Sequence, residues 1–455
     1  MAQKTVSSEE RHLMMTTAPI TGLILKLSGP TILAQLVTIL YNTADTYFVS
    51  SISTSASAAV GVCYSLASII QAVGFGFAMG INSLISRRLG AKDNESANMY
   101  AISATVGAAL CGLLITVGGL LTLDWLMDIM GSTETILPYA KAYARWILII
   151  APISCINSVL VCVLRAEGSV KISTIATTSG CIVNCFLDPL FISVFHMGTA
   201  GAALATALSQ CVTTVICLSI FFSGKSIVKL KLSKTSKKFS DYSQIILTGL
   251  PTVCRQGMGS IATALINRKA RFYGDAAVAA VTIANKVYML MRNIIIGVGQ
   301  AFQPVAGYNY GAGIKSRTKK AFWVAVIYGT ILSTAAAAII ALIAPGLMSV
   351  FRADDAVVIE FGARMLRFMS LSLPILAYST FVNQLYQCLG YKWTATLLAC
   401  CRQGIFFVPL VLILPNLLAE TGIQMTQAAA DILTALVSVP FNISFFRKHL
   451  RNEEA

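Results

Sequence analysis

Long apolar stretches separated by short polar segments repeat along the whole 455-residue chain. Each stretch reaches about 20 residues, the length that an α-helix needs to cross the hydrocarbon core of a bilayer. The strands of a membrane barrel would alternate apolar and polar residues, and these stretches do not. The pattern predicts an all-α membrane protein with about 12 transmembrane helices, centred near residues 37, 72, 111, 150, 182, 210, 256, 291, 331, 373, 403 and 435.

Composition agrees with this interpretation. Hydrophobic residues make up 56% of the chain and charged residues 12%, whereas soluble domains carry roughly 25% charged residues. The net charge is +15, but the basic residues cluster between apolar stretches, so we expect no nucleic-acid partner. The chain has no zinc-binding Cys/His spacing, no phosphate-binding loop of an ATPase and no clustered catalytic residues. We therefore expect a protein that is not an enzyme and needs no organic cofactor.

Charge also predicts sidedness. Basic residues mark alternate connections, including 87–92, 225–238 and 315–320, while the intervening connections are acidic or neutral. Because cytoplasmic loops retain positive charge, we expect a multi-pass protein of the cytoplasmic (inner) cell membrane with both termini in the cytoplasm. Arg268, Lys269 and Arg271 fall on the outer side in this scheme, unless they belong to the seventh helix itself.

The two halves of the chain repeat each other. Pro30-Thr31 matches Pro251-Thr252 at an offset of 221 residues, and Gly168 matches Gly390 at an offset of 222. Six helices per half is an even number, so equivalent helices point the same way and the predicted pseudo-twofold axis runs along the membrane normal. Two such lobes can enclose a cleft that opens to alternate sides. The predicted domains are an N-lobe (1–222), a basic cytoplasmic linker (223–241) and a C-lobe (242–455).

Asp45 and Asp188 are lone carboxylates inside apolar stretches, where an acid costs about 2.5–3.5 kcal/mol on insertion scales. The helical rise brings both acids and Thr206 to one depth in the outer half of the N-lobe. Asn184 lies one turn before Asp188 on the same face, and Pro189 frees a backbone carbonyl. Such an oxygen-rich set suits a hard cation or a shared proton. The alternative is that both acids only pin helices through hydrogen bonds.

Several of these stretches together resemble the multidrug and toxic compound extrusion (MATE) transporters. The resemblance rests on Pro30 with Asp45, Leu164–Gly168, Asn184–Pro189, Gly201–Thr206 and Gln303–Gly311. It covers nearly the whole chain and is closest to the prokaryotic branch with an aspartate on helix 1 and Asn-x3-Asp-Pro on helix 5. Another branch carries a glutamate in the middle of helix 7, where this chain has Arg255 and Gln256.

The resemblance implies antiport: Na⁺ or H⁺ enters while amphipathic, often cationic, organic compounds leave by alternating access. It also implies which residues surround the coupling ion. These are Asp45, Asn184, Asp188, Thr206 and the carbonyl of Ala202, with Tyr143 as a neighbour. We expect a monomer whose partners are small organic compounds and the lipid bilayer.

Other residues are candidates for the substrate or proton pathway. Tyr41 and Asn42 lie just before Asp45, and Pro30 kinks the first helix either as a hinge or as a fixed bend. Arg255, Gln256 and Lys286 lie in predicted spans of the C-lobe, where basic residues either snorkel to the surface or face the cleft. Positive charge in the cleft would favour the alternative function, a flippase for an anionic lipid-linked substrate.

Overall fold

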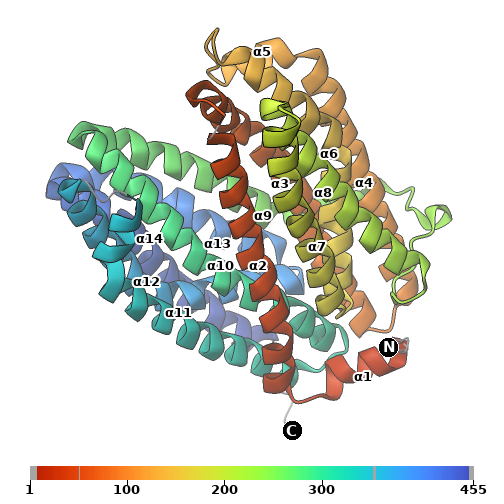
Figure 1. Cartoon of the computed structure of the whole chain (residues 1–455). Coiled ribbons are helices and arrows are strands. Elements are labelled where there is room, and N and C mark those ends of the chain that lie inside the picture. Colours follow the sequence, from red (N-terminus) through yellow and green to blue (C-terminus); the bar gives the residue numbers. More distant parts are fainter. Residues whose placement is uncertain (1–7, 51, 352–354, 450–455) are drawn as a thin grey trace. The chain divides into compact units, whose positions relative to one another are not determined.

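The structure, a computed structural model, describes residues 8–50, 52–351 and 355–449. Within these ranges the chain is helical and contains no strand (Figure 1). After a short helix, α1 (Ser8–Thr17), the first half forms six long helical segments. They are α2 (Ile20–Ser50), α3 (Thr54–Gly90), α4 (Asn94–Leu121), α6 (Leu137–Ala166), α7 (Val170–Pro189) with its π-helical continuation η1 (Leu190–Val194), and α8 (Gly198–Phe222). A short α5 (Leu123–Ile129) joins α4 to α6.

The second half follows the same plan after a short 3₁₀ turn, η2 (Leu232–Lys234). Its first helices are α9 (Phe239–Ala270), which ends in the 3₁₀ turn η3 (Arg271–Tyr273), α10 (Asp275–Gly311), α11 (Lys315–Phe351) and α12 (Ala356–Leu389). The last stretch comprises α13 (Lys392–Cys400), the π-helix η4 (Cys401–Phe406) and α14 (Phe407–His449). Arg268 and Lys269 thus belong to the seventh long helix, whereas Arg271 lies in the 3₁₀ turn that follows it.

The number of long helices matches the prediction. Ten helical stretches of the described chain are long and apolar enough to cross a membrane. The last of these, residues 392–449, is broken at Ala419, whose φ of 51° and ψ of −129° are not helical, so it contains two spans. With the more polar α9, 32 residues long, the described residues form twelve long helices. The predicted all-α membrane protein is confirmed.

Helix ends show why the chain turns where it does. Asp93 caps α4 by accepting a hydrogen bond from the backbone N–H of Ser96 at 3.0 Å. This bond and the nearby Arg88 guanidinium hold the pKa of the Asp93 carboxyl below its ordinary value. Gly168 ends α6 with a φ of 87°, and Gly390 ends α12 with a φ of 89°, a backbone conformation that favours glycine. These two glycines are paired in the sequence repeat, so the repeat fixes equivalent turns.

The described chain divides into two compact units. The first comprises the described residues up to Met15 together with Leu33–Gly249, and the second comprises Thr16–Ile32 together with the described residues from Leu250 onward. The chain passes from one unit to the other at three points, all inside helices: α1 after Met15, α2 just after Pro30 and α9 just before Pro251. The domain limits predicted from sequence, 222 and 242, remain predictions.

Candidate functional site

Asp188 and Asn184 form the centre of the candidate site in the first unit. Both side chains are fully buried near the end of α7, and Asn184 Nδ2 donates a hydrogen bond to Asp188 Oδ1 at 3.2 Å. Pro189 has no N–H to offer the carbonyl of Cys185, and the N–H of Leu190 bonds to the carbonyl of Leu187 instead. The chain then continues as the π-helix η1, a deviation that is frequent at functional sites.

Asp45 joins this centre from α2. It is close enough to Asp188 for the two carboxylates to interact electrostatically. Tyr41, one turn earlier on α2, interacts with both carboxylates, and so does Tyr143 of α6, whose side chain is buried. Three helices therefore contribute two acids and two phenols that interact with one another.

Three oxygens of this centre have no hydrogen-bond donor. Asp45 Oδ1, Asn184 Oδ1 and Asp188 Oδ2 are buried and unpaired in the described chain. A buried acceptor without a partner costs about 1–3 kcal/mol, and more when it is charged. Unpaired oxygen acceptors on neighbouring side chains fit a hard cation, or a proton on one of the carboxylates. Hydrogen bonds alone, the helix-pinning alternative, leave these atoms unsatisfied.

The other predicted ligands lie on α8, which packs against both α6 and α7. Ala202 is fully buried and Thr206 is half-buried. The carbonyl of Thr206 accepts a hydrogen bond from Ser209 Oγ at 2.8 Å. No hydrogen bond joins Thr206 or Ala202 to either carboxylate in the described residues, so their part in ion binding stays a prediction. Asn42 is exposed, and its amide donates to the carbonyl of Thr38 at 2.7 Å.

The remaining candidates lie in the second unit. Pro30 lies inside α2, and its neighbour Thr31 donates from Oγ1 to the carbonyl of Gly297 on α10 at 2.7 Å. Arg255 and Gln256 are half-buried on α9, whereas Lys286 is exposed on α10. The structure thus anchors the N-terminal part of α2 to α10 directly beside the proline.

A buried acid that the sequence reasoning missed lies in the second unit. Asp431 of α14 is fully buried, and Arg402 Nε donates to its Oδ1 at 2.7 Å. Gln427 also donates to Oδ1, at 2.9 Å, while Ser372 at 3.1 Å and Tyr288 donate to Oδ2. Arg402 Nη2 in turn donates to the Tyr288 hydroxyl at 2.9 Å. Asp431 is a lone carboxylate in an apolar stretch, so the signal that identified Asp45 could have found it.

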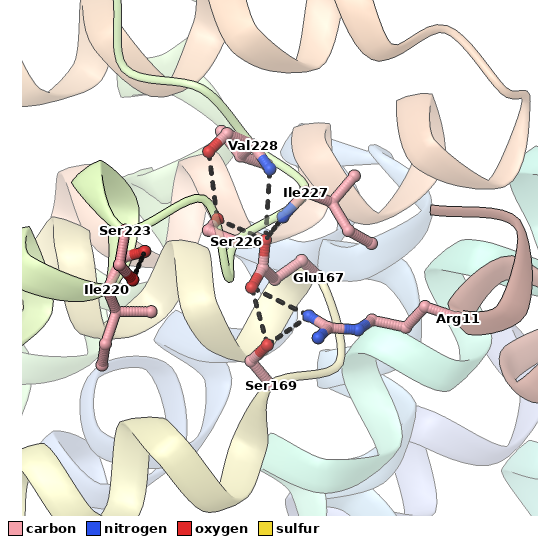
Figure 2. Close-up of polar contacts among 8 residues, drawn as sticks. All are labelled: Arg11, Glu167, Ser169, Ile220, Ser223, Ser226, Ile227 and Val228. Carbon is pink, nitrogen blue, oxygen red and sulfur yellow. Dashed lines mark hydrogen bonds and ion pairs between the residues drawn. The ribbon is translucent and has the colours of Figure 1, made fainter. Parts of the chain in front are cut away.

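A second buried acid explains the Leu164–Gly168 motif. Glu167 lies between α6 and α7, and its side chain is fully buried in the first unit. Figure 2 shows its carboxylate among donors from three separate segments. Arg11 Nη1 (3.0 Å) and Ser169 Oγ (2.6 Å) donate to Oε1, and Ser226 Oγ (2.7 Å) and the amides of Ile227 (2.9 Å) and Val228 (3.2 Å) donate to Oε2. We call these six residues the Glu167 cluster.

The fold and the site can be compared with known proteins. The MatE family model matches residues 30–190 and again residues 250–413, so both halves of the internal repeat carry it. The chain belongs to the MatE family. MatE family membership confirms the sequence resemblance and agrees with a transporter rather than an enzyme.

Similar proteins include the Multidrug export protein MepA of Staphylococcus aureus strain bovine RF122 / ET3-1. It is 25% identical over 439 residues, which cover 95% of each chain. A solved structure described as MATE in complex with MaL6 has a TM-score of 0.91 and 27% identity, and covers 98% of this MatE chain and 100% of its own. A second, described as the outward-facing conformation of a multidrug resistance MATE family transporter of the MOP superfamily, has a TM-score of 0.91, 28% identity and the same coverage.

Proposed function

We propose that this chain is a secondary active exporter that exchanges Na⁺ or H⁺ for amphipathic organic compounds, cationic ones among them, by alternating access across the cell membrane. The observation that carries the proposal is the group of three unpaired buried oxygens on Asp45, Asn184 and Asp188. The name of the MepA relatives, multidrug export proteins, supports export of chemically varied compounds. The flippase alternative gains no support from these comparisons.

Charge neutralisation would supply the coupling. Two carboxylates that interact in a poorly hydrated place repel each other, and a bound cation or proton removes much of that repulsion. The Asn184 amide donates to one oxygen of Asp188 and leaves its own Oδ1 to face a cation. Ion loading therefore favours whichever conformation holds these oxygens together. An organic compound that binds the other conformation more tightly drives ion release, because each ligand shifts the equilibrium by its differential affinity.

Transport in everted vesicles tests the proposal. Uptake of a cationic dye should follow an imposed Na⁺ or pH gradient, and Asp45→Asn and Asp188→Asn should each abolish this gradient dependence while the protein still folds. Asn184→Ala should weaken ion affinity without abolishing transport, because the amide is one ligand of several. Asp128→Asn is the matched control, since Asp128 is exposed on α5 of the same unit.

The two ions give different results in the same assay. A sodium site predicts that Na⁺ stimulates transport at fixed pH and that H⁺ competes with it, whereas a proton site predicts no response to Na⁺. If both aspartate variants keep full gradient-driven uptake, the three oxygens serve only structure and the proposal is wrong.

A further inference from the structure

The second unit brings together more positive charge, on the buried Arg402 and the half-buried Arg255 and Arg292, than its carboxylates neutralise. Arg255 of α9 and Arg292 of α10 both interact electrostatically with Arg402 of η4 and with each other. Asp431 is the carboxylate that interacts with this group. Of the other described acids of the second unit, Asp275, Asp355 and Glu360 lie at or near helix starts, and Glu420 lies beside the break in α14 at Ala419. Three guanidinium groups therefore share one carboxylate.

The carboxylate of Asp431 already forms an ion pair with Arg402. Both of its oxygens accept two hydrogen bonds each, and Arg402 supplies one of them within an ion pair. Neither Arg255 nor Arg292 makes a hydrogen bond to any described residue, and Arg292 Nε is buried without an acceptor. A buried charge is retained when it meets a counter-charge and acceptors for its hydrogen bonds. Arg255 and Arg292 have no acceptor among the described residues, and Asp431, the carboxylate that interacts with Arg292, is already paired with Arg402.

Local structure keeps the three arginines together. Gly404 of η4 lies so close to α9 that a Cβ atom there would meet Met258 Sδ at 3.0 Å, and Met258 is one turn after Arg255. Tyr288, one turn before Arg292 on α10, binds both Arg402 and Asp431. The π-helical turn that carries Arg402 is itself a deviation that is common at functional sites.

We propose that Arg255 and Arg292 form a binding site for the anionic group of an amphipathic compound: a carboxylate, a sulfonate or a phosphate. Guanidinium groups match these anions with paired hydrogen bonds. The site extends the proposed function, because it gives the chain a second class of ligand, anionic and zwitterionic compounds. Ligand binding at this site needs no ion gradient. A failure of the anion-site proposal can therefore be separated from a failure of the antiport proposal.

Two xanthene dyes of opposite charge provide the test. Carboxyfluorescein is anionic and rhodamine 123 is cationic, and binding of each to the purified chain in phosphatidylcholine nanodiscs can be measured by fluorescence anisotropy. We expect Arg255→Gln and Arg292→Gln each to weaken carboxyfluorescein binding about tenfold or more, equivalent to about 1.4 kcal/mol. Rhodamine 123 should bind both variants at least as tightly as wild type, which also shows that they fold. Arg268→Gln is the matched control, because Arg268 lies exposed on the same helix as Arg255.

An anionic lipid headgroup has the same chemistry as the dye, so a further arm separates the two sources. Part of the phosphatidylcholine is replaced by phosphatidylglycerol. If the lipid displaces carboxyfluorescein from wild type, the headgroup is the resident ligand and the assignment to an organic compound is overturned. The proposal is also overturned if wild type does not bind carboxyfluorescein, or if both arginine variants bind it as tightly as wild type does.

Discussion

Removing the Glu167 carboxylate measures how strongly the Glu167 cluster stabilises the first unit. Glu167→Ala leaves the buried Arg11 guanidinium without its counter-charge, and removing one partner of a buried ion pair costs about 3–5 kcal/mol. Two backbone amides and two hydroxyls lose their acceptor as well. A domain of this size loses about 2–4 °C of melting temperature per kcal/mol, so we expect the midpoint to fall by roughly 6–20 °C.

The chain provides its own reporter for this measurement. Its 12 cysteines are all free, and each is buried or half-buried, so a thiol-reactive fluorogenic dye labels them as the protein unfolds. All variants must be heated at one scan rate, because membrane proteins often unfold irreversibly. Glu95→Ala is the control, since the Glu95 side chain is 86% exposed and its pair with Lys234 contributes at most about 1 kcal/mol.

A double variant separates the ion pair from the hydrogen bonds. The double variant Arg11→Met/Glu167→Met removes both charges. It should melt at a higher temperature than the single variant Glu167→Met, because no uncompensated charge remains. The reasoning is refuted if Glu167→Ala melts within about 2 °C of wild type, less than the smallest shift expected.

Three further changes can be followed by the same melting assay. Ala419→Gly should stabilise the protein by about 1 kcal/mol, because the φ of 51° and ψ of −129° at Ala419 are strained for any residue with a Cβ. Asp93→Ala removes the cap of α4 and should cost about 1 kcal/mol at neutral pH. Because the folded-state pKa of Asp93 is depressed, this contribution is lost as pH falls below about 4, and the two proteins should then melt together. Gly249→Ala places a Cβ against the carbonyl of Gly76 and should lower the midpoint, whereas Gly118→Ala points into open space and should not.

The long helices and the two lone acids of the first unit could be identified from the sequence for a simple physical reason. Apolar length defines a membrane span, and a lone acid within such a length is costly wherever the fold places it. Asp45 and Asp188 satisfied that test, and the helical rise alone put them at one depth. Asp431 satisfies it too, so the same rule identifies a buried acid in the second half of the chain. The sequence does not predict the hydrogen-bond partners of Asp431, because Arg402 and Tyr288 lie on separate helices.

The Glu167 cluster was beyond sequence reasoning for a different reason. Arg11 and Glu167 are separated by 156 positions in the sequence. The amides of Ile227 and Val228 are backbone groups, so the pattern of side chains does not predict that they bind Glu167. Glu167 also lies in a polar turn, where an acid is expected to be solvated. Only the folded chain shows that this carboxylate is fully buried.

The two repeated units share a scaffold but differ in the charge of their interiors. At the offsets of the repeat, Asp45 corresponds to Ile266, and Arg402 corresponds to Gly180. The kinking prolines and the left-handed glycines recur, so the repeat preserves the backbone and not the charged groups. The interior of the first unit has two carboxylates with unpaired oxygens, the proposed cation site. The second unit has three guanidinium groups that interact around one carboxylate, and two of them form the proposed anion site. Because the two sets differ in sign and are built from different residues, neutralising one set should leave the ligand affinity of the other intact in a direct binding assay.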